Sequence, residues 1–462
     1  MSTMTDSLTK FNWQPQPAAQ AVLDSIISDF LAACPQAAVL AKRMKEETGT
    51  RFKDWIDFIQ LPKSSGLEAK IREVGYSLDP QAGAAQCYFH HGAMFPHVLF
   101  VAGGPLVVAI KVDCVADFVA SWGLHDVKIV GEPLSQFRLA TVFSSPGAEL
   151  AVVERHGYRG FVPAPIDANK GIASLRHLEA FRTRNRDLPD DHAGYAHAMK
   201  LFDAAAAEVG RDWAADLFFW SEREFWQRRN RAAQVQKARQ DKLGLGWANH
   251  DHHTYRCSRA TFKEHVALFE KMGFHCRESF YAGAEAGWGA QVMEAPVGGF
   301  TTFNDVDMSP EELLGDFSHE GFSQDSGKLG TVGIWCELHG QALLQAGMHH
   351  LECQFDHHAL VEQLDREAAI KTMAPFTTFP YLRQAFTHGE QWAIKPERAN
   401  KLLTAGLITA EQCERFIKDG ALGSHMENLE RNDGFKGFNQ QGVSDIIART
   451  DPRRRPLAAG AH

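Results

Sequence analysis

Two pairs of adjacent histidines and one glutamate in the C-terminal half could together bind a metal ion. The pairs are His252-His253 and His349-His350, and the glutamate is Glu427. Two imidazoles and one carboxylate on one face of a metal are the ligands of non-haem Fe(II) oxygenases, which keep three coordination positions open. Successive side chains of a strand point to opposite faces, so we expect one histidine of each pair to face the metal. Spacing alone is a weak argument, because the chain has 22 histidines.

The composition is that of an ordinary soluble globular protein. The chain has 462 residues, of which 44% are hydrophobic and 23% charged, enough for several domains. A formal charge of −9 disfavours nucleic-acid and anionic-membrane partners. The polar start of the chain has no apolar core of a signal peptide. Eight scattered cysteines without a CxxC motif favour reduced thiols and a cytoplasmic location.

The hydrophobic pattern predicts an alternation of helical and mixed regions. Residues 18–63 have a helical period, and strands are predicted between 86 and 154 around one helix, Val115–Trp122. A charged helical region with several tryptophans, about 172–243, follows. The second mixed region begins near residue 245, and its predicted strands include Asp251–Cys257, Gly330–Glu337, Met348–Phe355 and Leu422–Glu430.

A weak internal repeat predicts the fold class. Val107–Gly123, Asp251–Gly273 and Met348–Leu364 each begin as a strand that leads into a helix. We interpret the chain as an α+β protein of repeated βαβββ modules that curve into half-barrels around a cavity. The first copy has Ile110 and Lys111 where the later copies have histidine, so we expect it to bind no metal.

These patterns divide the chain into five parts. They are a helical N-terminal region (1–85), a metal-free βαβββ domain (86–165), a helical insertion (166–245), a metal-binding double-module domain (246–450) and a disordered tail (451–462).

Short motifs in the C-terminal half resemble the 4-hydroxyphenylpyruvate dioxygenase family of the vicinal oxygen chelate superfamily. Asp251-His252 with the helix His265–Phe274 resembles the family's first ligand strand and helix. Gly347–Leu351 resembles the second histidine strand, and Glu427–Arg431 resembles the glutamate strand. This resemblance implies a vicinal oxygen chelate fold in which His252, His350 and Glu427 bind Fe(II).

The resemblance also implies a reaction and further site residues. A 2-oxo acid would chelate the iron, and O2 would drive oxidative decarboxylation and hydroxylation of the same molecule. Phe435 and Asn439 match a C-terminal gating helix that lines or closes the cavity, and Asn304 matches an asparagine of the substrate pocket. Other positions depart from the family: Lys436 and Gln440 replace a glycine and a phenylalanine, and Ala290 stands at a serine position. These departures leave the substrate open.

Other readings of the same residues stay open. The chain could be an extradiol-type oxygenase, a non-oxidative isomerase or lyase that uses Mn, Ni or Zn, or a ligand-binding protein without turnover. Nucleotide chemistry and a serine nucleophile have no support, because P-loop, GxGxxG and GxSxG motifs are absent. The oligomeric state, the identity of the metal in the cell and the role of residues 166–245 stay open as well.

Overall fold

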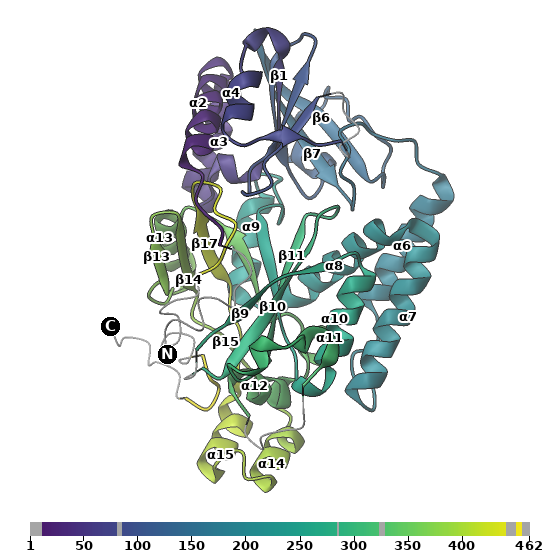
Figure 1. Ribbon diagram of the computed structural model, residues 1–462, viewed down its shortest axis with the longest axis vertical. Helices are drawn as coiled ribbons and strands as arrows, with labels where there is room; N and C mark the ends of the chain where they lie inside the picture. The colour runs from purple at the N-terminus through teal and green to yellow at the C-terminus, as the bar shows by residue number, and fades with distance from the viewer. Residues whose placement is uncertain (1–11, 81–85, 284–285, 323–328, 440–449, 455–462) are drawn as a thin grey trace.

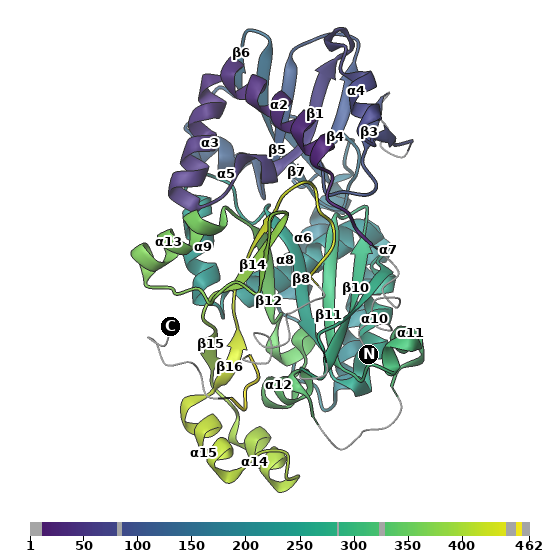
Figure 2. The same ribbon diagram turned by 60° about the vertical axis from the view of Figure 1, so that its left-hand side comes forward.

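The structure, a computed structural model, describes residues 12–80, 86–283, 286–322, 329–439 and 450–454. Two curved sheets follow one another along the long axis, the N-terminal sheet at one end and the C-terminal sheet in the middle (Figures 1 and 2). Helices α6 (Ala168–Arg182) and α7 (Asp191–Val209) lie to one side of the C-terminal sheet. The hairpin of α14 (Pro396–Thr404) and α15 (Ala410–Asp419) forms the opposite end.

The N-terminal sheet has seven strands in the order β2-β3-β4-β1-β5-β7-β6. Strand β1 pairs in parallel with β4, β5 pairs in parallel with β7, and β1 meets β5 antiparallel at the centre. This is the topology of two βαβββ modules, with helices α4 (Glu68–Glu73) and α5 (Val115–Ser121), although the second module has only an isolated bridge, Val130 to Leu139, in place of one strand. The strands are β1 (Ile56–Pro62), β2 (Ser77–Leu78), β3 (Cys87–Phe89), β4 (His97–Val101), β5 (Leu106–Lys111), β6 (Phe137–Ser145) and β7 (Ala148–Arg155).

Two features of this sheet differ from the sequence prediction. Residues 56–62 were expected in a helical region, and they form the central strand β1. Apolar residues of β1 are buried on both faces, so its sequence lacks the polar–apolar alternation that identifies a half-buried strand. The sheet also contains a second module, with β1 as its first strand, where the sequence indicated one module.

Apolar side chains cover both faces of the N-terminal sheet. One face packs against α2 (Pro17–Ala33) and α3 (Pro35–Thr48) in a large hydrophobic cluster. The other face forms a smaller cluster in which Phe58, Val107 and Ala109 pack with Phe161 from the chain that follows β7. The N-terminal sheet therefore encloses a packed apolar core, whereas the C-terminal sheet encloses polar groups.

Helices α8 (Arg211–Gln227) and α9 (Arg231–Asp241) complete the helical region, and α8 packs in the same hydrophobic cluster as the C-terminal sheet. Although α8 is rich in charge, Trp213, Phe218 and Trp226 are buried in it. Its Glu222 is fully buried and accepts hydrogen bonds from Arg184 and Arg186 of the loop before α7. Paired charges thus allow α8 to be a core helix.

The C-terminal sheet has eight strands in the order β13-β14-β17-β12-β8-β11-β10-β9. Strands β8 and β11 are parallel, β12 and β17 are parallel, and β8 meets β12 antiparallel. Helices α10 (Phe262–Lys271) and α13 (His357–Ala368) complete two βαβββ modules, which confirms the predicted fold class. The strands are β8 (His250–Arg256), β9 (His275–Tyr281), β10 (Trp288–Ala295), β11 (Phe300–Asp307), β12 (His350–Gln354), β13 (Thr377–Phe379), β14 (Leu382–Phe386) and β17 (Glu427–Arg431).

An insertion between β14 and β17 carries the helical hairpin. It consists of β15 (Glu390–Trp392), α14, α15 and β16 (Ala421–Ser424), and β15 pairs with β16 in a separate two-stranded sheet. The strand predicted over Leu422–Glu430 is therefore two strands, β16 and β17, separated by His425 and Met426.

The strand predicted over Gly330–Glu337 is wrong, because these residues belong to helix α12 (Thr331–His339). The Asp307 carboxylate accepts hydrogen bonds from the backbone N–H groups of Gly330, Val332 and Gly333 and so caps the start of this helix. Almost every residue of α12 is buried, and a helix that is apolar on all sides has no period that distinguishes it from a buried strand.

No single described helix is both long and apolar enough to cross a membrane. Helices α2 and α3 reach the required length and composition only as a pair, and they meet at a bend of 115°.

His156 links the N-terminal sheet to α8 and should make stability depend on pH. Its ring lies 3.3 Å from Glu154 and 2.9 Å from Asp216 of α8. Burial alone would lower the pKa of His156, but these two carboxylates raise it to about 9. Because the folded-state pKa exceeds the unfolded value of about 6.5, the stabilisation is complete below that pH and is lost as the pH rises through about 9.

We therefore expect His156→Gln to lower the free energy of unfolding by about 2 kcal/mol at pH 6, and by much less at pH 9.5. Chemical denaturation of both proteins at several pH values measures this. The exposed His125→Gln variant is the control. A loss in His156→Gln that stays constant with pH would contradict the assignment.

Candidate metal centre

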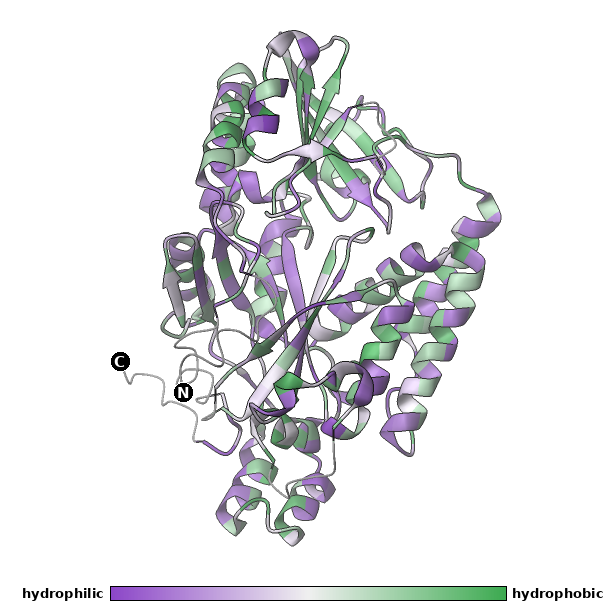
Figure 3. Ribbon diagram, viewed as in Figure 1, coloured by the Kyte–Doolittle hydropathy of each residue, from purple (hydrophilic) through white to green (hydrophobic). Residues whose placement is uncertain are grey.

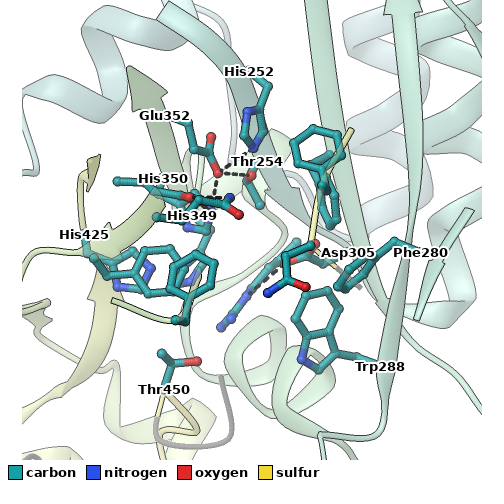
Figure 4. Close-up of a pocket in the computed structure, with 18 residues that line it drawn as sticks. His252, Thr254, Phe280, Trp288, Asp305, His349, His350, Glu352, His425 and Thr450 are labelled. Carbon is teal, nitrogen blue, oxygen red and sulfur yellow. Dashed lines mark hydrogen bonds and ion pairs between the residues drawn. The ribbon is translucent and has the colours of Figure 1, made fainter. Parts of the chain in front are cut away.

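Four ionisable side chains meet where the two modules of the C-terminal sheet join. In the register of β8 and β12, Glu352 lies opposite His252, and His350 lies opposite Thr254. Strand β17 places Glu427 beside Glu352. The side chains of His252, His350, Glu352 and Glu427 are 3%, 9%, 1% and 3% exposed, so the cluster is buried at the centre of the sheet (Figure 4).

One carboxylate oxygen of Glu352 lies at the middle of this cluster. Its Oε1 is 3.0 Å from His252 Nε2, 2.5 Å from His350 Nε2 and 2.7 Å from the Thr254 hydroxyl, which donates to it. Glu427 Oε2 is 3.7 Å from His350 Nε2. The structure therefore brings the three predicted ligands, His252, His350 and Glu427, together and adds Glu352.

A sequence signal for Glu352 exists. Both His350-Leu351-Glu352 and His425-Met426-Glu427 have the form His-x-Glu. Two residues apart on a strand means the same face, so Glu352 had to lie on the same face as His350.

Neighbouring groups orient the candidate ligands. Asp251 Oδ1 is 2.8 Å from His252 Nδ1 and is held in turn by Arg431. Burial would raise the pKa of Asp251, but the charge of Arg431 outweighs it and lowers the pKa below its usual value. An ionised Asp251 accepts the Nδ1–H of His252 and leaves Nε2 with a lone pair toward the cluster, as in metal-binding histidines. Gln384 donates to Glu427 Oε1 at 2.9 Å.

The electrostatics of the cluster fit a bound cation. Burial raises the pKa of Glu427 to about 7. Burial first, and then the charge of Glu427, raise the pKa of Glu352 well above its usual value. Glu352 Oε2 and His350 Nδ1 are buried and have no hydrogen-bond partner. Two imidazoles and two carboxylates are suitable donors for Fe(II), and a divalent ion would offset the repulsion between the carboxylates.

A cavity of about 60 Å³ opens next to the cluster. Much of its wall is aromatic, and the rings that line it are those of Phe280, Trp288, Phe303, Phe376, Phe386 and Phe438. Its polar wall includes Arg256, Asp305, His349 and His425 (Figure 4). The described residues thus form a site with both an aromatic and a polar lining.

Arg256 provides the strongest positive charge at this cavity. It follows His252 and Thr254 on the same face of β8 and is 2% exposed. Its Nε lies 3.6 Å from Asp305, and neither Nε nor Nη1 has a hydrogen-bond partner. Burial raises the pKa of Asp305 to about 8. A guanidinium that retains two unused donors is suited to an anionic or strongly polar ligand.

The expectation that neighbouring histidines face opposite sides holds for one pair only. His252 lines the cavity, and His253 packs on the other face against Phe219 and Phe300. In the second pair, both His349 and His350 line the cavity, so that expectation is wrong. The reason is that β12 begins at His350, and His349 precedes the regular strand.

The other predicted site residues lie in different surroundings. Asn439 lines the cavity, and its amide donates to Thr377. Phe435 does not line it; this ring packs against Leu382 and Leu429, and Phe438 lines the cavity instead. Residues 435–439 are not helical, and Gln440, like the rest of the predicted gating helix, falls outside the described residues.

Asn304 lies on the opposite face of β11 from the cavity. Its amide oxygen is 2.9 Å from His265 Nε2, and its amide nitrogen donates to the backbone of Gln291. Its neighbour Asp305 lines the cavity, because successive residues of β11 alternate. Glu430 and Glu427 likewise point apart along β17, and Glu430 accepts a hydrogen bond from the backbone N–H of His357.

Solved structures of low sequence identity are similar to this chain. No protein-family model and no curated protein matches the chain. A glyoxalase-superfamily protein from Ralstonia eutropha aligns with 60% of this chain and 99% of its own at 11% identity and a TM-score of 0.33. A variant of 4-hydroxymandelate synthase from Streptomyces coelicolor aligns with 87% and 99% at 12% identity and a TM-score of 0.24. Methylmalonyl-CoA epimerase from Mycobacterium tuberculosis aligns with 40% and 89% at 12% identity and a TM-score of 0.23. At such low similarity, conclusions about this chain depend on its own site.

Asp251 should tune the affinity of the centre for metal. Asp251→Asn keeps the shape of the side chain but removes the charge that holds His252, so we expect metal to bind about tenfold more weakly. Titration of the metal-free protein with Co2+ or Fe2+ under argon measures this. Asp356→Asn, which replaces one good helix cap by another at the start of α13, is the matched control. Equal affinities of Asp251→Asn and the wild-type protein would contradict the role.

Proposed function

We propose that this protein is an Fe(II)-dependent oxygenase that converts a 2-oxo acid by oxidative decarboxylation and hydroxylation of the same molecule. The convergence of His252, His350 and Glu427 in one buried cluster carries the proposal. Iron in this position would supply Lewis acidity and the activation of O2. The resemblance of the surrounding motifs to 4-hydroxyphenylpyruvate dioxygenases supports the reaction class.

The residues of the chain have two tasks in this reaction. Asp251 and Gln384 hold His252 and Glu427 in position. The aromatic rings of the cavity exclude water, which protects a reactive oxidant from side reactions. Phe438 lies next to a proposed iron ligand, since its ring centroid is 4.9 Å from that of His252.

The polar wall of the cavity indicates the type of 2-oxo acid. Phe280, Trp288 and Phe303 can contact the carbon chain of a substrate, and the Arg256 guanidinium lies on the same wall with unused donors. A second acidic group at the far end of the substrate would satisfy those donors. We therefore infer a 2-oxo acid whose tail ends in an acidic or strongly polar group.

A second candidate function follows from Glu352. A carboxylate 3.0 Å from His252 Nε2 is placed to take a proton from a substrate bound at the metal, which is the chemistry of a non-oxidative isomerase or lyase. Its raised pKa is compatible with general-base action. Turnover under argon, abolished in Glu352→Gln, would favour this candidate.

The ligand assignment predicts coupled loss of iron and activity. His252→Ala, His350→Ala and Glu427→Gln should each lose iron and lower the rate by at least about 1000-fold, because three protein ligands are the minimum for the facial site. Iron content, O2 uptake and CO2 release are measured with a panel of 2-oxo acids.

The matched control is Glu430→Gln, on the same strand but the opposite face. It should retain iron and activity. Full activity in any one of the three ligand variants would remove that residue from the site, and O2 uptake without CO2 release would exclude a 2-oxo acid.

Replacing Arg256 should change which 2-oxo acids the protein prefers as substrates. Arg256→Leu should lower kcat/KM for a 2-oxo acid with a terminal carboxylate by about 10- to 100-fold, which corresponds to the loss of one charged hydrogen bond. The same variant should leave kcat/KM for a 2-oxo acid with an alkyl tail nearly unchanged. An equal loss for both substrates would show that Arg256 only supports the fold.

A further inference from the structure

Three buried histidines converge beside the proposed iron ligands. His349, His350 and His425 each offer a ring nitrogen, and these nitrogens lie within 4.8 Å of one another. The centroids of the three rings are 4.7 to 4.9 Å apart. His349 and His425 come from the segments that precede β12 and β17, so the two His-x-Glu strands bring them together (Figure 4).

Several nitrogens of this group have no hydrogen-bond partner among the residues that the structure describes. Both ring nitrogens of His425, Nε2 of His349 and Nδ1 of His350 are buried without a hydrogen bond. A buried polar atom without a partner is costly, so such a group requires water or an ion. Each of the three adjacent rings thus has a nitrogen available for one bound ion, which would satisfy three of these four atoms.

The hydrogen bond made by Nδ1 of His349 orients the ring so that Nε2 can bind a metal. Its Nδ1 lies 3.0 Å from the backbone carbonyl of Gly423, to which it must donate. The remaining proton is thereby fixed on Nδ1, and Nε2 presents its lone pair. Around the group lie aromatic rings: that of Phe386 stacks on His425 at 4.2 Å, and that of Trp335 lies 5.3 Å from His349.

We propose that His349, His350 and His425 bind a second divalent cation next to the proposed iron. Three imidazoles without a carboxylate favour Zn2+, Ni2+ or Cu2+. His350 is shared: its Nε2 faces Glu352 and Glu427, and its unpartnered Nδ1 faces away from them. His350 would therefore offer one nitrogen to each of the two sites. The proposal deepens the function proposed above and rests on it for the first ion only.

Counting metal in the full-length protein tests this inference. The protein is stripped with a chelator, loaded with Zn2+ and freed of excess, and zinc per chain is measured. We expect two ions in the wild-type protein and one in His349→Asn and in His425→Asn. Glu427→Gln should lose the other ion. Loading with Co2+ should give two sets of visible absorption bands, of which His425→Asn lacks one.

His339→Asn is the matched control. His339 is a buried histidine beside Trp335, and its Nε2 is bound to the backbone carbonyl of Leu422. This variant should keep both ions. Circular dichroism checks that each variant is folded, and His425→Gln replaces His425→Asn if the latter is not.

The outcomes distinguish the three-histidine site from the proposed iron site. A single ion in the wild-type protein that disappears in Glu427→Gln would overturn the second site and leave the proposed function intact. Two ions in His425→Asn would also overturn it. Zinc binding that is lost in His425→Asn but kept in Glu427→Gln would support the three-histidine site and contradict the proposed iron site.

Discussion

The antiparallel pairing of β8 with β12 is the contact on which the site depends. Its register places His350 opposite Thr254 and Glu352 opposite His252. His252 in the first module and His350 in the second therefore occupy equivalent positions in this pair of strands. The two histidines therefore lie on a diagonal across one junction. A shift of β12 by one residue would turn His350 and Glu352 to the other face and abolish the site. Strand β17, paired in parallel with β12, adds Glu427 beside Glu352.

That junction holds more charge than a sheet centre normally accepts. Figure 3 shows hydrophilic colour along the central strands of the C-terminal sheet, where the N-terminal sheet is mainly hydrophobic. The outer groups are paired, as Asp251 is with Arg431. The inner groups, Glu352 and Glu427, have imidazoles as neighbours, and burial keeps these imidazoles neutral by lowering the pKa of His252 and His350. Burying two carboxylates against neutral rings is costly unless a cation joins them.

The sequence was sufficient for the module pattern of the C-terminal half and for three residues of the cluster, because strand and helix periods and the His, His, Glu order are local features. It was insufficient where apolar residues are buried on both faces of a strand, as in β1, or around most of a helix, as in α12, because neither element then shows its period. His349 was misplaced because the start of β12 depends on its partner strand. Asn304 was assigned by resemblance alone, whereas the alternation along β11 turns Asp305 to the cavity.

The N-terminal sheet shows that the fold alone does not create the site. Its junction of β1 with β5 has the same topology, yet Phe58 pairs with Ala109 there, and Phe161 packs on the same face. Such a sheet is stabilised by apolar burial and needs no cation. At the centre of the C-terminal sheet, histidines and carboxylates replace the apolar residues, so this part of the sheet lacks that stabilisation. A polar junction that weakens the apo-protein is understandable where ion binding restores the stability, since a ligand bound only by the folded state shifts the folding equilibrium toward it.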